Sequence, residues 1–369
     1  MSTRAALDGV VVADFSRVLA GPYATMLLGD LGAEVIKIER PGTGDDTRAW
    51  GPPFDADGTA TYFNSVNRNK TSVVLDLTTE SGRARAREIV AGADVVVENF
   101  RAGTMERLGL GYDDLRAVKD DVIYCAITGF GRAEGAALAG YDLLVQAVGG
   151  LMSITGPEPG APAKVGVAVV DVLTGLHALA GIQAALFHRQ RTGEGQRIDI
   201  NLLSALLSSL VNQASGYLGA GVVPGILGNR HPSIVPYEVF PTADRPIAIA
   251  VGNDKQFGAL CSALGASGLA GDSRFATNPQ RVKNRDELFT LLSDALAPHG
   301  ADYWFKTLTG AGVPAGPIND VAEAIRFAES LGLTPTVAVP GSRTPQIANP
   351  IEMSATPPQY RSAPPTLDG

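Results

Sequence analysis

The chain has 369 residues, enough for about two domains. Hydrophobic residues make up 45% and charged residues 18%, as in chains that fold around a large buried core. The formal net charge of −8 disfavours nucleic acid as a partner, because nucleic-acid binding needs an excess of cations.

Other sequence features limit the setting of the protein. The cysteines Cys125 and Cys261 are far apart and form neither a disulfide framework nor a metal-binding spacing. No uncharged apolar run reaches the ~20 residues that a membrane span needs, and no signal-peptide layout precedes the first strand. We therefore expect a cytoplasmic protein without a membrane partner.

A β-α-β pattern opens the chain. Residues 10–16 read as a buried strand, and Gly21-Pro22 opens a helix that runs to about Leu31. Further strands and helices follow at residues 35–39, 72–77, 80–91, 94–98 and 122–128. This alternation predicts an α/β fold with a parallel, Rossmann-like sheet.

The second half of the chain predicts a smaller α/β domain after a loop rich in Gly and Pro. Helices and strands up to that loop are expected at residues 141–151, 172–190, 197–201 and 202–217, and beyond it at 247–251, 255–264, 281–297, 303–311 and 321–331. The expected large domain takes residues 1–218 with 332–369, and residues 219–331 form the small domain and its linkers. The extended tail after Thr334 must lie on the first domain or on a partner subunit, since it has little core of its own.

Asp171 stands where an apolar, strand-like run gives way to a helical pattern. Asp is a preferred helix N-cap, so a capping role is one interpretation. The other is a carboxylate nucleophile that forms acyl intermediates. Local pattern alone leaves both open.

Cations gather near predicted strand ends, where ligands of open α/β sheets bind. They are Arg17, Arg40, Lys70, Arg101 and Arg107. These side chains could bind phosphates or lie on the solvated surface. The loop Leu19–Ala24 lacks the glycine fingerprint of dinucleotide-binding folds, which argues against NAD, and the four histidines have no metal-ligand spacing.

Several ordered motifs resemble the class III CoA-transferase family, which also contains α-methylacyl-CoA racemases. The motifs are Leu7-Asp8-Gly9, Ala20-Gly21-Pro22, the run from Leu28 to Pro41, Asn67–Lys70, Val97–Phe100, Gly129–Gly131, Gly140-Tyr141-Asp142, Val170-Asp171, Thr192–Gln196 and Gly312–Pro317. The resemblance covers nearly the whole chain. It implies a large Rossmann-like domain, a smaller domain and an interlocked homodimer.

The same resemblance assigns roles to individual residues. Asp171 matches the catalytic aspartate. Positions that contact CoA in the family are matched here by Val18, Ala20, Arg40, Lys70, Asn99, Phe100 and Arg107. Tyr141 is expected near the thioester. No tightly bound cofactor is implied, because the CoA thioester is the substrate.

The implied reaction moves CoA from an acyl-CoA to a small carboxylic acid through a mixed anhydride on Asp171. Stretches around residues 228–237 and 252–257 look like transferases that use succinyl-CoA and a dicarboxylate, for which Arg230 is the candidate contact. A run of four glycines found in formyl-CoA transferases is missing, which puts oxalate as the acceptor in doubt. Two alternatives remain. One is an α-methylacyl-CoA racemase, although Tyr141 stands where racemases have His, and the other is a CoA-binding protein without turnover.

Overall fold

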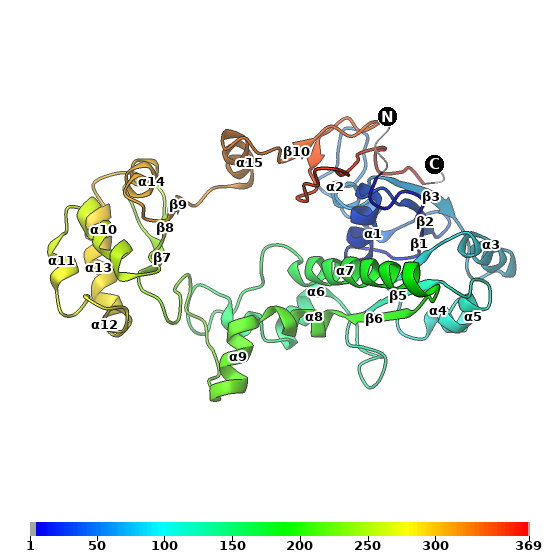
Figure 1. Cartoon of the computed structure of the whole chain (residues 1–369), viewed down its shortest axis with the longest axis horizontal. Coiled ribbons are helices and arrows are strands. Elements are labelled where there is room, and N and C mark those ends of the chain that lie inside the picture. The colour runs from blue at the N-terminus through cyan, green and yellow to red at the C-terminus, as the bar shows by residue number, and fades with distance from the viewer. Residues whose placement is uncertain (1–4, 368–369) are drawn as a thin grey trace. The chain divides into compact units, whose positions relative to one another are not determined.

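The computed structural model describes residues 5–367, which form two compact units (Figure 1). The larger unit comprises the chain up to Met152, Lys164–Pro224 and the chain from Gly332 onward. The smaller unit comprises Ser153–Ala163 and Gly225–Leu331.

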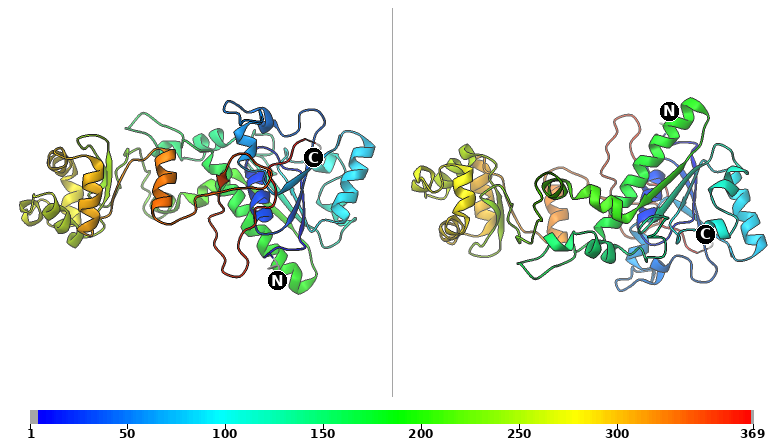
Figure 2. Two further views of the ribbon diagram at one scale, coloured as in Figure 1. Left: turned by 90° about the horizontal axis from the view of Figure 1, so that it is seen from above. Right: turned by 90° about the horizontal axis from the view of Figure 1, so that it is seen from below.

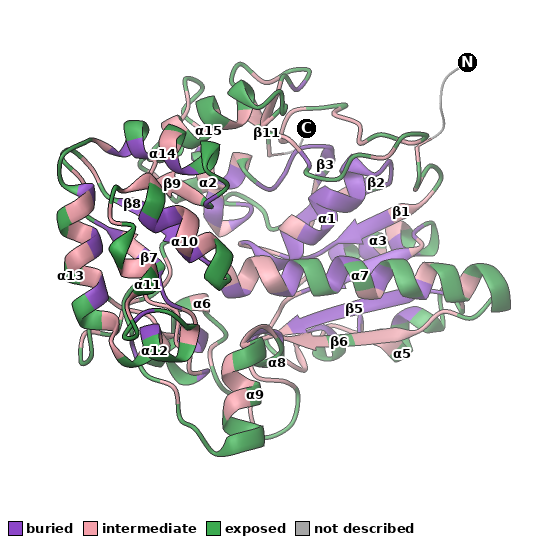
Figure 3. Cartoon of the chain, turned by 60° about the vertical axis from the view of Figure 1, so that its left-hand side comes forward, coloured by how far each residue is buried: buried purple, intermediate pink, exposed green. Residues whose placement is uncertain are grey.

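A six-stranded parallel sheet forms the centre of the larger unit, with strand order β3-β2-β1-β4-β5-β6. The strands are β1 (Val11–Asp14), β2 (Glu34–Glu39), β3 (Lys70–Val74), β4 (Val95–Glu98), β5 (Ile123–Thr128) and β6 (Arg197–Asn201). Figure 3 shows β1 and β5 buried, while β6 at the sheet edge is only partly covered. The predicted α/β fold with a parallel sheet is confirmed.

Helices cover both faces of this sheet. The helices of the larger unit are α1 (Ala20–Asp30), α2 (Thr61–Asn64), α3 (Glu80–Ala91), α4 (Thr104–Arg107), α5 (Tyr112–Arg116), α6 (Asp142–Val148), α7 (Val169–Thr192), α8 (Leu202–Ser209) and α9 (Val211–Ala220), with 3-10 turns at Asp46–Ala49 and Met152–Ile154. Strand side chains alternate between the faces. Val95 and Val97 of β4 join the core beneath α1 and α7, whereas Val96 joins the core beneath α3 and α5.

Helix α7 is the central helix of the larger unit and lies beside α1 in both views of Figure 2. Gly175 makes this close approach feasible, because a Cβ there would lie 2.7 Å from the Ala20 carbonyl oxygen. By length and composition α7 would suffice to cross a bilayer. Its buried residues Val170, Ala178 and Ile182 belong to the core beneath α1, which is the ordinary reason for such a composition.

Two predicted helices are each broken in two. The helix expected at 202–217 divides into α8 and α9 at Val211, whose φ is +35°. The one expected at 281–297 divides into α12 and α13 at Asn284, which ends the first and begins the second. Hydrophobic periodicity continues through both breaks, so the sequence pattern did not reveal them.

The smaller unit contains an antiparallel sheet in the order β7-β8-β9. Its elements are β7 (Tyr237–Phe240), β8 (Ile247–Ala250), α10 (Asp254–Ala263), α11 (Gly268–Gly271), α12 (Asn278–Lys283), α13 (Arg285–Leu296), α14 (Ala301–Gly310), β9 (Ala315–Pro317) and α15 (Val321–Ser330). Of its strands, only β8 was predicted. Phe240, Phe257, Leu292 and Trp304 are core residues of this unit.

The predicted domain boundaries need two corrections. The division falls after Pro224 rather than after residue 218, and Ser153–Ala163 belongs to the smaller unit. That segment packs against the start of the linker, since a Cβ on Gly156 would lie 3.2 Å from Ile226 and one on Gly228 would lie 2.8 Å from the Pro157 carbonyl oxygen. Such contacts between distant segments leave no local pattern in the sequence.

The carboxyl-terminal tail lies on the larger unit, one of the two predicted alternatives. After a short hairpin of β10 (Thr336–Val337) and β11 (Gln346–Ile347), it reaches the end of α1. Gln359 N donates to the Asp30 carbonyl at 2.7 Å, and the Arg361 guanidinium donates to the Ala33 carbonyl at 2.6 Å. Main-chain carbonyls at the end of α1 therefore hold the tail.

Candidate active site

A cavity of about 440 Å³ opens in the larger unit at the carboxyl ends of β1, β4 and β5. The chain leaves β1 and β4 toward opposite sides of the sheet here, the position at which open α/β sheets bind ligands. Its walls come from the segments Arg17–Ala20, Asn99–Ala102, Ile127–Gly131, Gly135–Tyr141, and from Asp46, Thr104, Asp171 and Leu202.

Six of the residues predicted from the family resemblance line this one cavity. They are Val18, Ala20, Asn99, Phe100, Tyr141 and Asp171. They come from four separate stretches of sequence, which the parallel sheet brings to one edge. The structure thus supports a common site for these six residues.

Lys70, which the family resemblance matches to a CoA-contacting position, does not line this cavity. Its fully buried Nζ donates to Asp14 Oδ2 at 3.1 Å, to the Pro22 carbonyl at 3.0 Å and to Asn67 Oδ1 at 3.0 Å. An ammonium has three donors, so all are engaged within the protein. Burial lowers the pKa of Lys70 to about 8 even though Asp14 opposes that effect. These three bonds join Lys70 to β1, to α1 and to the segment before β3.

Arg40 and Arg107 also lie outside the cavity wall, at its edge. The exposed Arg40 donates to Thr43 Oγ1 at 2.7 Å and forms an ion pair with Asp46, which does line the cavity. Arg107 donates to Thr104 Oγ1 at 2.9 Å. The guanidinium groups that line the cavity are instead those of Arg17 and Arg101, two cations noted in the sequence but not matched to the family.

Asp171 occupies the third position of α7 and is not its N-cap, so the capping interpretation is wrong. The N-cap residue is Ala168, whose side chain cannot accept a hydrogen bond. Asp142, the first residue of α6, supplies the cap. Its Oδ1 accepts from Val170 N at 2.8 Å and from Asp171 N at 3.3 Å.

The Asp171 carboxylate is left available by this arrangement. No recorded hydrogen bond or ion pair within residues 5–367 involves its side-chain oxygens. Burial, and to a lesser extent the neighbouring Asp142 carboxylate, raises the pKa of Asp171 to about 7. A perturbed carboxylate in the wall of a cavity is typical of a functional site.

Asp142 and Tyr62 lie near Asp171 without lining the cavity, and the sequence analysis gave neither a role. Asp142 also accepts from Gln146 Nε2 at 2.6 Å, which fixes its carboxylate at the start of α7. Burial and the nearby charges of Asp171 and Asp142 raise the pKa of Tyr62 to about 12, so its hydroxyl stays protonated. The Gly140-Tyr141-Asp142 motif was a signal for Asp142, but only the fold shows which helix it caps.

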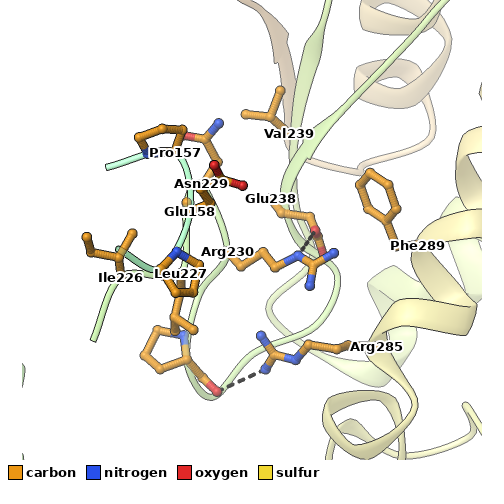
Figure 4. A pocket seen from close by; sticks show the side chains of 13 residues that line it. Pro157, Glu158, Ile226, Leu227, Asn229, Arg230, Glu238, Val239, Arg285 and Phe289 are labelled. Atoms are coloured by element: carbon orange, nitrogen blue, oxygen red, sulfur yellow. Dashed lines mark hydrogen bonds and ion pairs between the residues drawn. The ribbon is translucent and has the colours of Figure 1, made fainter. Parts of the chain in front are cut away.

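A second cavity, of about 570 Å³, lies within the smaller unit (Figure 4). Arg230 and Arg285 both line it. Arg230 pairs with the buried Glu238 through Nε at 3.1 Å and with the exposed Asp286 through Nη1 at 2.8 Å. Arg285 donates to the Pro232 carbonyl at 3.0 Å. The predicted substrate contact Arg230 is therefore already paired with two carboxylates.

Comparison with known proteins decides the family. The profile of CoA-transferase family III matches residues 7–369. The chain belongs to CoA-transferase family III. This membership agrees with the cavity and its unpaired aspartate, and it confirms the resemblance inferred from the motifs.

Close relatives support the same conclusion. The succinate–glutarate CoA-transferase of Agrobacterium fabrum is 47% identical over 98% of this chain and 92% of its own. The acetyl-CoA:oxalate CoA-transferase of Acetobacter aceti is 41% identical over 98% of this chain and 92% of its own. A crystal structure of a CAIB/BAIF family protein from Brucella suis superposes with a TM-score of 0.90 at 44% identity and covers 99% of this chain and 97% of that one.

The activity follows from the family and these relatives. The protein is an enzyme, an acyl-CoA:carboxylate CoA-transferase. The enzymes of Agrobacterium fabrum and Acetobacter aceti are both named as CoA-transferases, which favours transfer over the racemase and non-catalytic alternatives.

Proposed function

We propose that Asp171 is the nucleophile of this CoA-transferase and that the cavity around it holds the thioester end of an acyl-CoA. One observation carries the proposal. A carboxylate with a pKa of about 7 stands in the cavity wall, and no recorded hydrogen bond or ion pair in residues 5–367 occupies its oxygens. Half ionised near neutral pH, such a carboxylate is more basic, and hence more nucleophilic, than an exposed aspartate.

The chemistry balances with Asp171 alone as the covalent group. A carboxylate oxygen of Asp171 attacks the thioester carbonyl, and the carbon–sulfur bond breaks. CoA departs as the thiolate, and Asp171 and the acyl group are joined in a mixed anhydride. The thiolate then attacks the aspartyl carbonyl, which releases the donor acid and leaves an aspartyl thioester. The acceptor carboxylate attacks this thioester to form a second anhydride. Return of the thiolate to the acceptor's acyl carbon gives the new acyl-CoA and frees Asp171.

The remaining cavity residues are proposed to bind CoA and shield the reacting atoms. Phe100 offers an apolar ring whose face carries the Arg17 guanidinium at 4.6 Å, so this pair presents both a hydrophobic surface and a cation. Arg101, with Arg40 at the edge, would neutralise phosphate. Tyr141, which is 61% exposed, lies at the mouth beside Gly140.

Trapping the intermediate tests the proposal. The enzyme is mixed with succinyl-CoA and hydroxylamine, and we expect succinyl hydroxamate together with free CoA. Asp171→Asn should form it only at the rate of the enzyme-free mixture, in which hydroxylamine attacks the thioester directly. Asp113→Asn, which removes an exposed carboxylate in α5 of the same unit, should match the native enzyme. Hydroxamate formation by Asp171→Asn at the native rate would remove Asp171 from the mechanism.

We further propose that succinyl-CoA is the donor and that a dicarboxylate is the acceptor. Relatives named for succinate and glutarate support this choice, and another relative is named for oxalate. Arg230 remains the proposed contact of the second carboxylate. Its Nη1 partner Asp286 is exposed, and an exposed ion pair is weak enough for an incoming anion to displace.

Acceptor kinetics test the Arg230 proposal. In Arg230→Gln we expect the KM for glutarate to rise about tenfold, the loss of one charge-assisted contact, with little change for a monocarboxylate. Arg285→Gln is the control, because Arg285 lines the same cavity but donates to main-chain carbonyls. An equal loss with both acceptors would show that Arg230 only maintains the fold of the smaller unit.

We also propose that the enzyme is an interlocked homodimer, as the family resemblance implies. Apolar side chains on the larger unit remain strongly exposed in a single chain, including Leu218 at 82% and Val223 at 78%. Exposed apolar patches of this kind mark protein interfaces. A single species of one-chain mass in light scattering at micromolar concentration would contradict this proposal.

A further inference from the structure

The turn between β1 and α1 holds a strained residue in the wall of the candidate CoA cavity. Val18 has a φ of +69°. A β-branched residue rarely adopts this left-handed conformation, and such strain persists only where the surrounding structure enforces it. Because Val18 lines the cavity next to Arg17 and Ala20, its backbone conformation shapes the binding surface.

Side chains from the neighbouring strand β2 and from two loops bind backbone groups of this turn. The Val18 N–H donates to both oxygens of Asp45 at 3.3 Å. The Arg17 backbone is bound twice by Asn99, which accepts from its N at 2.8 Å and donates to its carbonyl at 2.6 Å. The Ser16 carbonyl accepts from Lys37 Nζ at 3.0 Å.

Lys37 and Asp45 form a single buried unit. The Lys37 ammonium lies 2.9 Å from Asp45 Oδ2, and both side chains are 0% exposed. Asp45 Oδ1 also accepts from Thr47 N at 3.0 Å and from Thr47 Oγ1 at 2.8 Å. Although burial acts to raise the pKa of Asp45, Lys37 and these hydrogen bonds hold it below its ordinary value. The Val18 N–H therefore meets a fully ionised acceptor.

We propose that the Lys37–Asp45 pair is a positioning device that holds Val18 in its left-handed conformation and so preforms the cavity wall for the CoA thioester. Neither side chain lines the cavity, so neither touches the substrate. Without the pair, residue 18 relaxes toward an extended conformation, and binding must restore the strained one. This inference rests on the proposed assignment of the cavity to CoA.

A double-mutant cycle between residues 18 and 45 tests the device. Asp45→Asn removes the charge, and Val18→Gly removes the penalty for positive φ, since glycine adopts it freely. We expect Asp45→Asn to weaken the Kd for succinyl-CoA about tenfold when residue 18 is Val and less than about threefold when it is Gly. An equal loss in both backgrounds would overturn the proposal, because Asp45 would then act through its neighbour Asp46 or through charge alone.

A matched control separates positioning from general stability. Asp30→Asn breaks another buried ion pair of the larger unit, in which Asp30 Oδ2 lies 2.7 Å from Arg68 Nη2. Arg68 contacts the carboxyl-terminal tail and not the turn. We expect this variant to lower the melting temperature as Asp45→Asn does and to keep the native Kd. If Asp45→Asn does not fold because Lys37 is left unpaired, Lys37→Met/Asp45→Asn takes its place in the same cycle.

Hydrogen exchange of the native enzyme tests the turn without substrate or substitution. The Val18 amide should exchange about 100-fold more slowly than an unstructured amide, because it donates to a buried carboxylate. Fast exchange at Val18 would overturn the proposal whatever the variants do. If instead the amide is protected but no CoA thioester binds the native enzyme, the assignment of the cavity fails while the description of the turn stands.

Discussion

The raised pKa of Asp171 gives the most specific prediction, for the variant Asp142→Asn. The carboxylate of Asp142 adds a like charge beside Asp171 and contributes, after burial, to raising that pKa from 3.8 to about 7. Asparagine keeps an oxygen that can accept from Val170 N, so the helix cap survives while the charge is lost. Less than half of the increase belongs to Asp142, since burial is the larger cause.

Ionisation of Asp171 should give an inflection in the pH profile of kcat/KM. In Asp142→Asn we expect this inflection to lie about one pH unit lower, which corresponds to about 1.4 kcal/mol less repulsion between the two carboxylates. With the inflection at about 7 in the native enzyme and about 6 in the variant, the ionised fraction at pH 6 rises about fivefold. The assay is kcat/KM for succinyl-CoA between pH 5 and 9, because this constant reports groups of the free enzyme.

Asp113→Asn serves as the control, since it makes the same change in net charge at an exposed site of the same unit. Its inflection should stay at the native position. An unchanged inflection in Asp142→Asn would refute the reasoning, because the Asp142 charge would then have no effect on Asp171. A shift toward higher pH would refute it more directly, since losing a like charge can only favour ionisation.

Three further predictions concern stability. At pH 8, Asp171→Asn should have a higher melting temperature than the native enzyme and an unfolding free energy that is larger by about 1–3 kcal/mol. The gain should vanish at pH 3, because a carboxyl group with a raised pKa stabilises the fold below its unfolded pKa and loses that contribution as the pH rises through about 7. Lys70→Met should lower the free energy of unfolding, measured in urea, by about 3–5 kcal/mol, because Asp14 is left as a buried unpaired charge. Native stability together with a loss of CoA affinity would instead place Lys70 in the binding site. Arg281→Met should destabilise the smaller unit by about 1–3 kcal/mol for each of the two carbonyls, of Val235 and Phe275, that lose their buried guanidinium donor. Proteolysis confined to other segments would contradict that expectation.

Much of the fold could be read from the sequence where local pattern is strong. The helix at Glu80–Ala91 and the strand at Arg197–Asn201 have the bounds that were predicted. Hydrophobic periodicity and helix signals act over a few residues, so they are visible in one stretch of chain. The strand β9 was missed because its sequence, Ala-Gly-Pro, contains two residues that are depleted in strands. The strand β7 was missed because it directly follows the loop rich in Gly and Pro.

The ordered motifs indicated the family and predicted four site residues that line the cavity: Asn99, Phe100, Tyr141 and Asp171. Their meeting at one edge of the sheet followed from parallel topology, in which the carboxyl ends of strands converge. The sequence did not determine the state of Asp171. Its third position in α7 and its raised pKa depend on burial and on Asp142, which lies 29 residues earlier.

Only the tertiary structure decided which charges are used inside the protein and which face a ligand. Lys70 was a candidate phosphate contact, yet its ammonium bonds to Asp14, which is 56 residues away in sequence and two strands away in the order β3-β2-β1. Arg230 was predicted to contact a substrate carboxylate, and the structure shows that it already pairs with Glu238 and Asp286. Secondary structure is set by neighbours along the chain, whereas the partners and pKa of a charge are set by neighbours in space, which a linear pattern does not contain.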